Sequence, residues 1–162
     1  MPTITRLNHV VLYVRDARKS LEWYQGALDF QPTSPPTDRG VFLRASGSEN
    51  HHDIALFSIG TEAPGPTRGK QVGMYHAAYE VATIEDLAEA RERLINHTAT
   101  DGKLVGETDH GASFSLYVHD PDGNELEIFW LLPREEWDRK PASRELRLDE
   151  KIAERKKTAA AV

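Results

Sequence analysis

The chain has 162 residues, of which 39% are hydrophobic and 28% charged, as expected for one compact globular domain or two closely packed half-size modules. It contains no cysteine, which excludes disulfide scaffolds, zinc–thiolate sites, iron–sulfur clusters and thiol nucleophiles. Any bound metal must therefore take nitrogen and oxygen ligands. The formal net charge of −6 argues against a nucleic-acid partner, because binding a phosphate backbone needs a concentrated basic face.

The apolar segments are too short for a membrane protein. No apolar run approaches the roughly 18 residues that are needed to span a bilayer. The N-terminus has no basic segment followed by an apolar core, so nothing marks the chain for export. We expect no membrane partner and a cytoplasmic location.

The first half of the chain predicts one strand, one helix and three short strands. Residues 7–14 (LNHVVLYV) form an apolar, β-branched run of strand length. Asp16 is the expected N-cap of a helix over residues 17–27. Three strand-like segments separated by turn residues follow, over residues 30–33, 41–44 and 53–59.

The second half repeats this pattern. Residues 73–81 (GMYHAAYEV) match the first strand, and Thr83 opens a near capping box that leads into a helix over residues 84–95. Each half therefore predicts the order β-α-β-β-β. The later strand-like segments of the second half cover residues 103–107, 113–119 and 125–131.

These elements predict an α+β fold in a single domain over residues 1–133, with module one at 5–60 and module two at 73–132. The segment between the modules is rich in Pro and Gly and is expected to cross the surface. Residues 134–162 form a charged, helical C-terminal tail with few apolar positions. Two interpretations stay open for it, a solvated helix that clasps a second subunit and an exposed, partly frayed terminus.

Two histidines and one glutamate stand out as metal ligands. His9 and His76 occupy equivalent places on the repeated strands, 67 residues apart. Because side chains alternate faces along a strand, His9 shares its face with Val11 and Tyr13. If the modules pack as a pseudo-symmetric pair, these faces line one cavity and the two imidazoles converge. Glu127 on the last strand also points inward, where an unpaired carboxylate is costly unless a cation accompanies it.

Two imidazoles and one carboxylate on one side of an ion form the facial triad that suits non-haem iron(II), with positions left open for substrate and oxygen. Manganese(II) takes the same ligands. Ala55 occupies the place in module one where a fourth ligand would lie, so we expect the coordination sphere to stay open there. A lone histidine on a strand more often makes a local hydrogen bond, but a repeat-matched pair with a carboxylate favours a metal site.

Several segments resemble those of a known family. Residues 108–110 (TDH), 116–123 (LYVHDPDG) and 124–127 (NELE) match the ring-cleavage signature of type I extradiol dioxygenases, the catechol-cleaving branch of the vicinal-oxygen-chelate superfamily that also holds glyoxalase I and bleomycin- and fosfomycin-resistance proteins. Residues 50–56 (NHHDIAL) resemble the paired-histidine segment of that family. The resemblance covers about residues 7–131, and it corresponds to only the catalytic half of the common two-domain enzymes. It implies a vicinal-oxygen-chelate (glyoxalase-like) fold.

The resemblance also assigns roles to individual residues. A histidine of near-neutral pKa takes a proton from a catechol and returns it later, while nearby hydrogen-bond donors stabilise oxygen-derived anions. The family pattern gives His52 the acid–base role, and it gives His110 and Tyr117 the role of donors to substrate and oxygen. The iron ligands that it implies are His9, His76 and Glu127.

The resulting hypothesis is an iron(II)-dependent enzyme that cleaves a catechol-type aromatic ring with O2 beside the hydroxyl-bearing carbons, and that assembles as a homo-oligomer as relatives of this size commonly do. One alternative is a metal-dependent glyoxalase-like lyase or fosfomycin-resistance-like transferase, although a glyoxalase would normally carry Glu in place of Ala55. The other alternative is a binding protein for an aromatic ligand, which would not need three convergent metal donors. The metal content of protein purified without oxygen separates the two classes.

Overall fold

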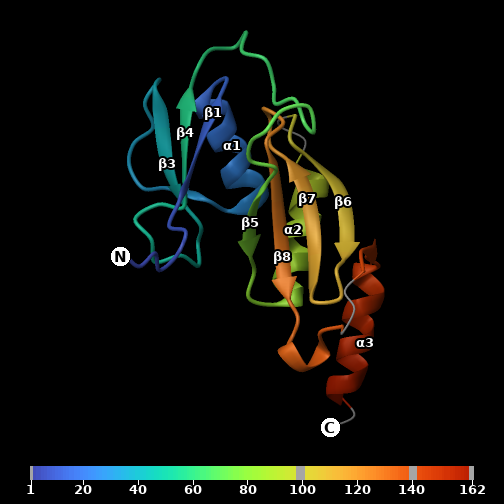
Figure 1. Ribbon diagram of the computed structural model, residues 1–162. Coiled ribbons are helices and arrows are strands. Elements are labelled where there is room, and N and C mark those ends of the chain that lie inside the picture. Colours follow the sequence, from blue (N-terminus) through green and yellow to red (C-terminus); the bar gives the residue numbers. More distant parts are fainter. Residues whose placement is uncertain (1, 98–100, 139–141, 161–162) are drawn as a thin grey trace.

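The computed structural model of the protein describes residues 2–97, 101–138 and 142–160. The first half has the predicted order of one strand, one helix and three strands, which we call module one (Figure 1). Its elements are β1 (Val10–Val14), α1 (Ala17–Leu28), β2 (Gln31–Pro32), β3 (Gly40–Arg44) and β4 (Ile54–Ser58).

Module two repeats this order and is followed by a short C-terminal segment (Figure 1). Its elements are β5 (Ala77–Glu80), α2 (Ile84–Asn96), β6 (Lys103–Asp109), β7 (Ser113–His119) and β8 (Glu125–Leu131). The segment after them consists of the 3-10 helix η1 (Arg134–Glu136), β9 (Arg144–Glu145) and α3 (Leu148–Ala160).

Each module forms its own sheet, and the two sheets have matching connections. The strand orders are β1-β4-β3-β2 and β5-β8-β7-β6-β9. In both sheets the first strand of the module pairs in parallel with the last, β1 with β4 and β5 with β8, and the other pairs are antiparallel. The predicted α+β fold of two βαβββ modules is confirmed.

Both module helices begin at the predicted caps. The carboxylate of Asp16 accepts hydrogen bonds from the backbone N–H groups of Arg18 and Lys19 at the start of α1. Thr83 and Asp86 form a complete capping box at the start of α2. Among the described residues, we find no helix that is both long and apolar enough to cross a bilayer.

The first strand of each module is shorter than the sequence predicts. Pairing begins at Val10, opposite Ile54, and at Ala77, opposite Leu126. His9 and His76 therefore stand immediately before strands instead of within them. In module one, the side chain of Asn8 before the strand contacts the side chains of Asn50 and His9.

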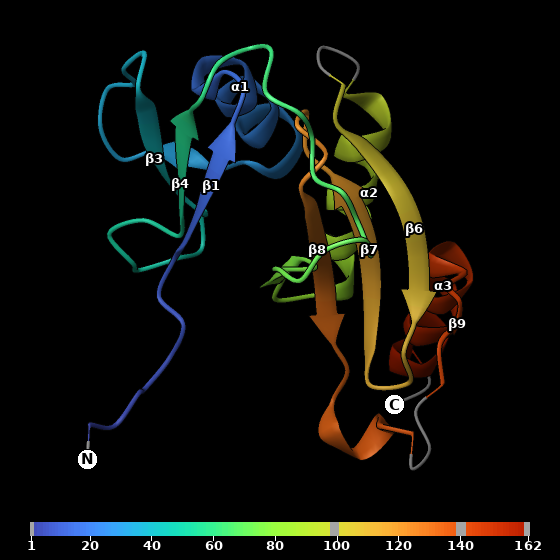
Figure 2. The same cartoon turned by 45° about the horizontal axis from the view of Figure 1, so that its top comes forward.

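Helix α1 joins the modules. Its Tyr24 is fully buried and donates a hydrogen bond from its hydroxyl to Oδ2 of Asp120, at 3.1 Å, in the turn between β7 and β8. Asp122 in the same turn accepts from the backbone and the guanidinium of Arg15, both at 3.0 Å. The two sheets consequently stand side by side, with the segment from β4 to β5 crossing between them (Figure 2).

The C-terminal tail packs on module two. Leu146 and Leu148 are buried, and the Arg155 guanidinium lies 4.7 Å from the ring centre of Trp130 on β8. The expectation of a helical tail is confirmed, but its apolar positions are covered by the same chain, so the tail is not simply a solvated extension. Residues 139–141 and 161–162 of the predicted tail lie outside the described residues.

Candidate functional site

Module one brings together two of the predicted residues, His9 and His52. Their ring centres are 4.3 Å apart, and the ring of Phe42 lies 5.0 Å from that of His52. His9 Nδ1 is 3.0 Å from Asn8 Oδ1. That contact holds the proton on Nδ1 and leaves Nε2 as the acceptor, which is how a histidine that binds a metal through Nε2 is oriented.

A network of amide and carboxylate groups positions these histidines. Asn8 donates to Asn50 Oδ1 at 3.1 Å, and Asn50 donates to the Asn8 carbonyl at 3.0 Å and to Asp53 Oδ1 at 2.7 Å. The loop before β1 is thus tied to the loop before β4. Sequence analysis missed these three residues as positioning groups, although Asn50 directly precedes the paired histidines and could have been noticed there.

The pKa of His52 lies below the ordinary value of a histidine. Burial is the main cause, and the neighbouring His9 and His51 add repulsion against a second positive charge. His51 Nδ1 is 3.0 Å from His52 Nδ1. A neutral imidazole at His52 has a free lone pair, so it has the protonation state that a proton acceptor needs.

Module two brings together the other four predicted residues. His76 Nε2 lies 3.1 Å from Glu127 Oε2, and its ring centre is 5.7 Å from that of Tyr117. The Tyr117 hydroxyl is 2.9 Å from His110 Nε2. On its other side, His110 Nδ1 is 3.2 Å from the Ser143 hydroxyl, a contribution from the C-terminal tail that sequence analysis did not foresee.

Burial raises the pKa of Tyr117 to about 12, with the charge of Glu127 as the next cause. The hydroxyl therefore stays protonated at neutral pH and acts as a hydrogen-bond donor. Since His110 accepts or donates at the same oxygen according to its tautomer, the pair can relay a proton toward the face that carries His76 and Glu127.

Glu125 forms a second layer behind His76. Its carboxylate is buried, pairs with Arg68, and lies 3.8 Å from His76 Nδ1 and 3.4 Å from His119 Nε2. The side chain of His119 therefore lies at this polar cluster, one quarter exposed. Glu125 lies two residues before Glu127 on β8 and therefore on the same face of the strand, but sequence analysis did not single it out.

The residues present fit a divalent metal of the iron(II) type. Buried His76 Nδ1 and Glu125 Oε1 have no hydrogen-bond partner among the described residues, and a proton on Nδ1 directed at Glu125 would leave Nε2 for the metal. Glu127 is a carboxylate with only 13% of its side chain exposed. Imidazole and carboxylate are the donors that such an ion prefers.

In the described part of the chain, the three predicted metal ligands do not lie together. That part contains no cluster of three or more His, Asp or Glu side chains placed to hold an ion. Figures 1 and 2 show why, since β1 runs in the opposite direction to β5 and β8, and His9 and His76 each precede the start of their strand. Within one chain the candidate site exists as two half-sites, one on each module.

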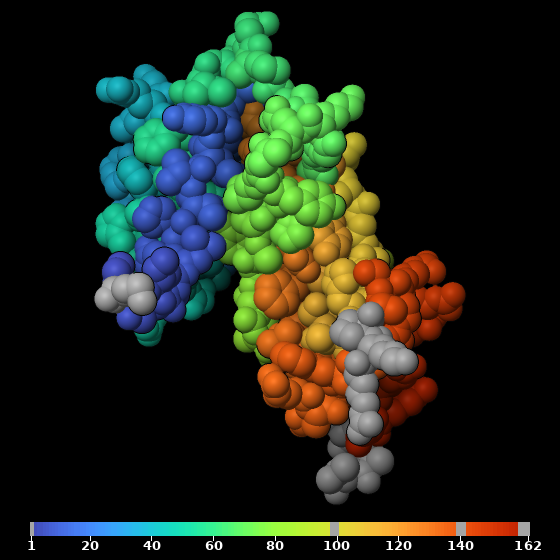
Figure 3. Space-filling model, viewed as in Figure 1, coloured from blue at the N-terminus to red at the C-terminus, as the bar shows by residue number. Residues whose placement is uncertain are grey.

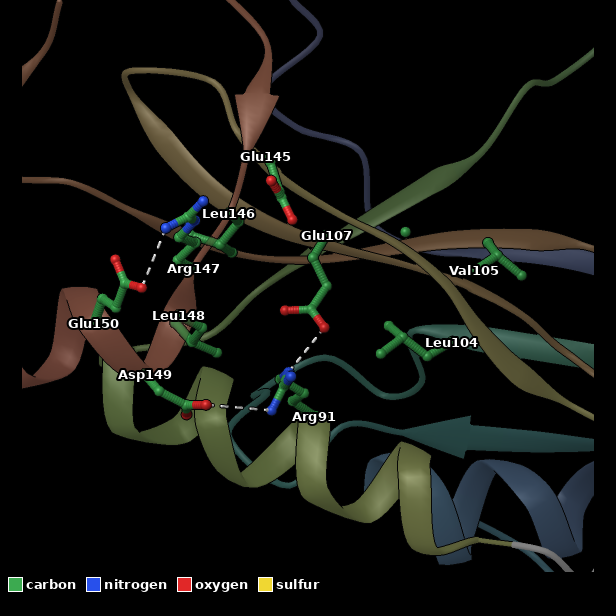
Figure 4. Close-up of a pocket in the computed structure, with 11 residues that line it drawn as sticks. Arg91, Leu104, Val105, Glu107, Glu145, Leu146, Arg147, Leu148, Asp149 and Glu150 are labelled. Carbon is green, nitrogen blue, oxygen red and sulfur yellow. Dashed lines mark hydrogen bonds and ion pairs between the residues drawn. The ribbon is translucent and has the colours of Figure 1, made fainter.

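Two cavities in the described part of the chain lie away from these residues. One of about 580 Å³ opens between α2, β6 and the C-terminal segment, where Arg91 bonds Glu107 and approaches Asp149 (Figure 4). Another of about 620 Å³ lies between the modules beside Phe30 and Tyr79. None of the six predicted residues lines either cavity.

Paired βαβββ modules, each with its first and last strands side by side in parallel, define the class of fold to which this protein belongs. The chain belongs to the Glyoxalase/Bleomycin resistance protein/Dioxygenase superfamily, whose family model matches residues 6–128.

Named relatives support this membership. A catechol-2,3-dioxygenase of Bacillus subtilis (strain 168) is 33% identical over 142 residues, which cover 83% of this chain and 45% of that protein. Biphenyl-2,3-diol 1,2-dioxygenase 2 of Rhodococcus globerulus is 31% identical over 128 residues, which cover 79% of this chain and 64% of that protein. The chain therefore spans less than two thirds of the length of either relative.

A solved structure supports the fold alone. The glyoxylase/bleomycin resistance protein/dioxygenase domain from Frankia sp. EAN1pec aligns with a TM-score of 0.65 at 22% identity, over 80% of this chain and 100% of that chain.

Proposed function

We propose that this protein is an iron(II)-dependent extradiol dioxygenase that opens the ring of a catechol-type aromatic with O2. The observation that carries the proposal is the content of the two half-sites. One holds a proposed histidine ligand beside a histidine of lowered pKa, and the other holds a histidine and a carboxylate, both proposed ligands, beside a tyrosine–histidine pair. The names of the curated relatives point to the same reaction.

His9, His76 and Glu127 would hold the metal. When bound, iron(II) supplies open coordination positions and a path for electrons between the aromatic ring and oxygen. Manganese(II) fits the same donors, so reconstitution with each metal separately identifies the active one.

The remaining residues bind and move protons. His52 would take a proton from a catechol hydroxyl, since its lowered pKa keeps it neutral, and would return that proton as the ring opens. Tyr117 and His110 would donate hydrogen bonds to oxygen atoms on which negative charge develops. Val11, Tyr13 and Phe129 would contact the ring.

The test is anaerobic reconstitution with iron(II), followed by addition of oxygen and a panel of catechols, with the yellow ring-opened product measured by absorbance. His76→Ala and Glu127→Ala should lose the metal. His52→Ala should retain the metal and lose most turnover, because its ring is not a ligand. Protein that binds catechols but takes up no metal would be a binding protein, and the proposed activity would be wrong.

A further inference from the structure

The C-terminal tail reaches His110 through one side chain, Ser143. The Ser143 hydroxyl lies 3.2 Å from Nδ1 of His110, and the Tyr117 hydroxyl lies 2.9 Å from Nε2 on the other side of the ring. Both imidazole nitrogens therefore have a partner. Because a neutral imidazole carries its proton on only one nitrogen, the two partners together decide which nitrogen is the hydrogen-bond donor.

We propose that Ser143 is a positioning residue for His110, which donates its hydroxyl proton to Nδ1 and so keeps the ring proton on Nε2, toward Tyr117. Ser143 acts through His110 and does not itself contact the substrate. The inference rests on the proposed function for what His110 does in the reaction. It does not rest on that function for the tautomer of His110, which can be measured in protein without metal.

The pairing of β9 with β6 places Ser143 opposite His110. Asp109 faces Arg144 in this antiparallel pair, so the next position in the same register brings His110 opposite Ser143. Side chains directly opposite each other in such a pair have Cβ atoms about 5 Å apart and lie on the same face. Figure 3 shows the C-terminal segment, orange to red, against the strands of module two. The backbone register therefore brings the hydroxyl to the imidazole.

Further contacts hold the backbone on both sides of this pair. The carbonyl of Gly111 accepts a hydrogen bond from the backbone N–H of Asp138 at 2.9 Å, and the carboxylate of Asp138 pairs with Arg144. Leu146, which directly follows β9, is 5% exposed. Since an ion pair, a backbone bond and a buried apolar side chain fix this part of the tail, the contact of Ser143 is more than a chance meeting at the surface.

The direction of the Ser143 hydrogen bond follows from Tyr117. Burial is the main cause that raises the pKa of Tyr117, and a hydrogen bond to Glu127 is a further cause. An ionised carboxylate only accepts, so the proton in that bond belongs to the phenol. The phenol oxygen is then left to accept from Nε2–H of His110. Nδ1 consequently has a lone pair, and the Ser143 hydroxyl is the donor to it.

A proton on Nε2 gives His110 the property that the proposed function needs. Nε2–H faces the side of the ring on which Tyr117 lies, and a donor there stabilises negative charge as it develops on oxygen. With the proton on Nδ1, a lone pair would face the same oxygen and repel that charge. A hydroxyl held at Nδ1 selects the donor form before the reaction begins, so the ring does not have to change its tautomer during turnover.

Proton–nitrogen correlation NMR of the metal-free protein tests the tautomer directly. Two-bond spectra recorded well above the ordinary histidine pKa of about 6.5 distinguish a protonated ring nitrogen from an unprotonated one. A His110→Gln spectrum identifies the signals of His110. The unmodified protein should carry the His110 proton on Nε2. Ser143→Ala should raise the fraction with the proton on Nδ1 several-fold, and Ser143→Thr, which keeps a hydroxyl, should restore the original tautomer.

Turnover of the iron-loaded protein tests the role in the reaction. Ser143→Ala should lower kcat about tenfold, with the KM for the catechol and the iron content unchanged, because Ser143 is neither a ligand nor a substrate contact. Ser143→Thr should recover most of the loss. Thr158→Ala is the matched control, since it removes another hydroxyl of the tail, one that donates to the Glu154 carbonyl within α3. It should change neither the tautomer nor kcat.

Several results would overturn the inference. A proton on Nδ1 of His110 in the unmodified protein would do so, as would a Ser143→Ala protein with an unchanged tautomer. A changed tautomer without loss of kcat would refute the role in the reaction, and equal losses in the Ala and Thr variants would assign the effect to packing of the tail. A protein that shows the tautomer change but cleaves no catechol refutes only the proposed function.

Discussion

Substitution of Tyr24 by phenylalanine tests the joint between the modules. The Tyr24 hydroxyl is the donor in a buried bond to Asp120, whose side chain is 1% exposed and also accepts from Asn124 and from the backbone of Asp122. Burial and the neighbouring carboxyl group raise the pKa of Tyr24 well above its ordinary value, so the hydroxyl remains a donor at every pH at which the protein is handled. The substitution removes the hydroxyl and nothing else.

The expected cost follows from the kind of bond. A hydrogen bond to a charged acceptor contributes about 1.5–3 kcal/mol, and the remaining donors to Asp120 keep the loss from being larger. For a chain of this length, 1 kcal/mol corresponds to a shift of roughly 2–4 °C in Tm. We therefore predict that Tyr24→Phe lowers Tm by about 3–12 °C.

Urea unfolding followed by circular dichroism measures the loss in the free energy of unfolding, and Tyr79→Phe is the matched control. The Tyr79 hydroxyl is also buried but has no hydrogen-bond partner among the described residues, so removing it should leave stability unchanged or slightly higher. Equal losses in the two variants, or a Tyr24→Phe loss below about 0.5 kcal/mol, would refute the assigned bond.

Three further substitutions test other parts of the fold. Gly102→Ala should destabilise by about 1–3 kcal/mol in urea titrations, because the added methyl group meets the buried indole of Trp23. Thr83→Ala removes the capping box of α2 and should cost about 1 kcal/mol, with lower helix content near the melting transition. Hydrogen bonding by Arg155 lowers the pKa of Glu136 below its ordinary value, so this ion pair stabilises above the unfolded Glu pKa of about 4.3 and is lost as pH falls through the lowered folded pKa. Because both side chains are more than one third exposed, Glu136→Gln should cost less than about 1 kcal/mol at pH 7 and nothing at low pH, which thermal melts at several pH values would check.

The long elements of the fold follow closely from the sequence. The strands at Ser113–His119 and Glu125–Leu131 match the predicted ranges, and each module helix extends one residue beyond its prediction. Alternation of apolar and polar residues, together with the capping side chains, determines them locally. The two-residue strand Gln31–Pro32 lies within the predicted segment 30–33. The strand Arg144–Glu145 pairs with β6, which is far away in sequence, so no local pattern predicted it.

The candidate site follows from the sequence only in part. The internal repeat places His9 and His76 at equivalent positions, and strand alternation places Glu127 on the face of β8 that bears Phe129. Neither pattern determines how one sheet lies relative to the other. Contacts across the joint determine that placement. Tyr24 and Asp120 are far apart in sequence, so no local sequence pattern indicates that they pair.

The same joint fixes the placement of one module relative to the other. The turn over residues 120–123 resembles a family signature, and its two aspartates also accept hydrogen bonds from α1 and from the residue that precedes its cap. Tyr24 donates to Asp120, and Arg15 and Ser20 donate to Asp122. Because the bond of Tyr24 to Asp120 is buried, releasing module one from module two would leave a buried carboxylate without one of its donors, at a cost of roughly 1–3 kcal/mol. A chain that keeps this turn bonded to α1 therefore holds its two half-sites apart.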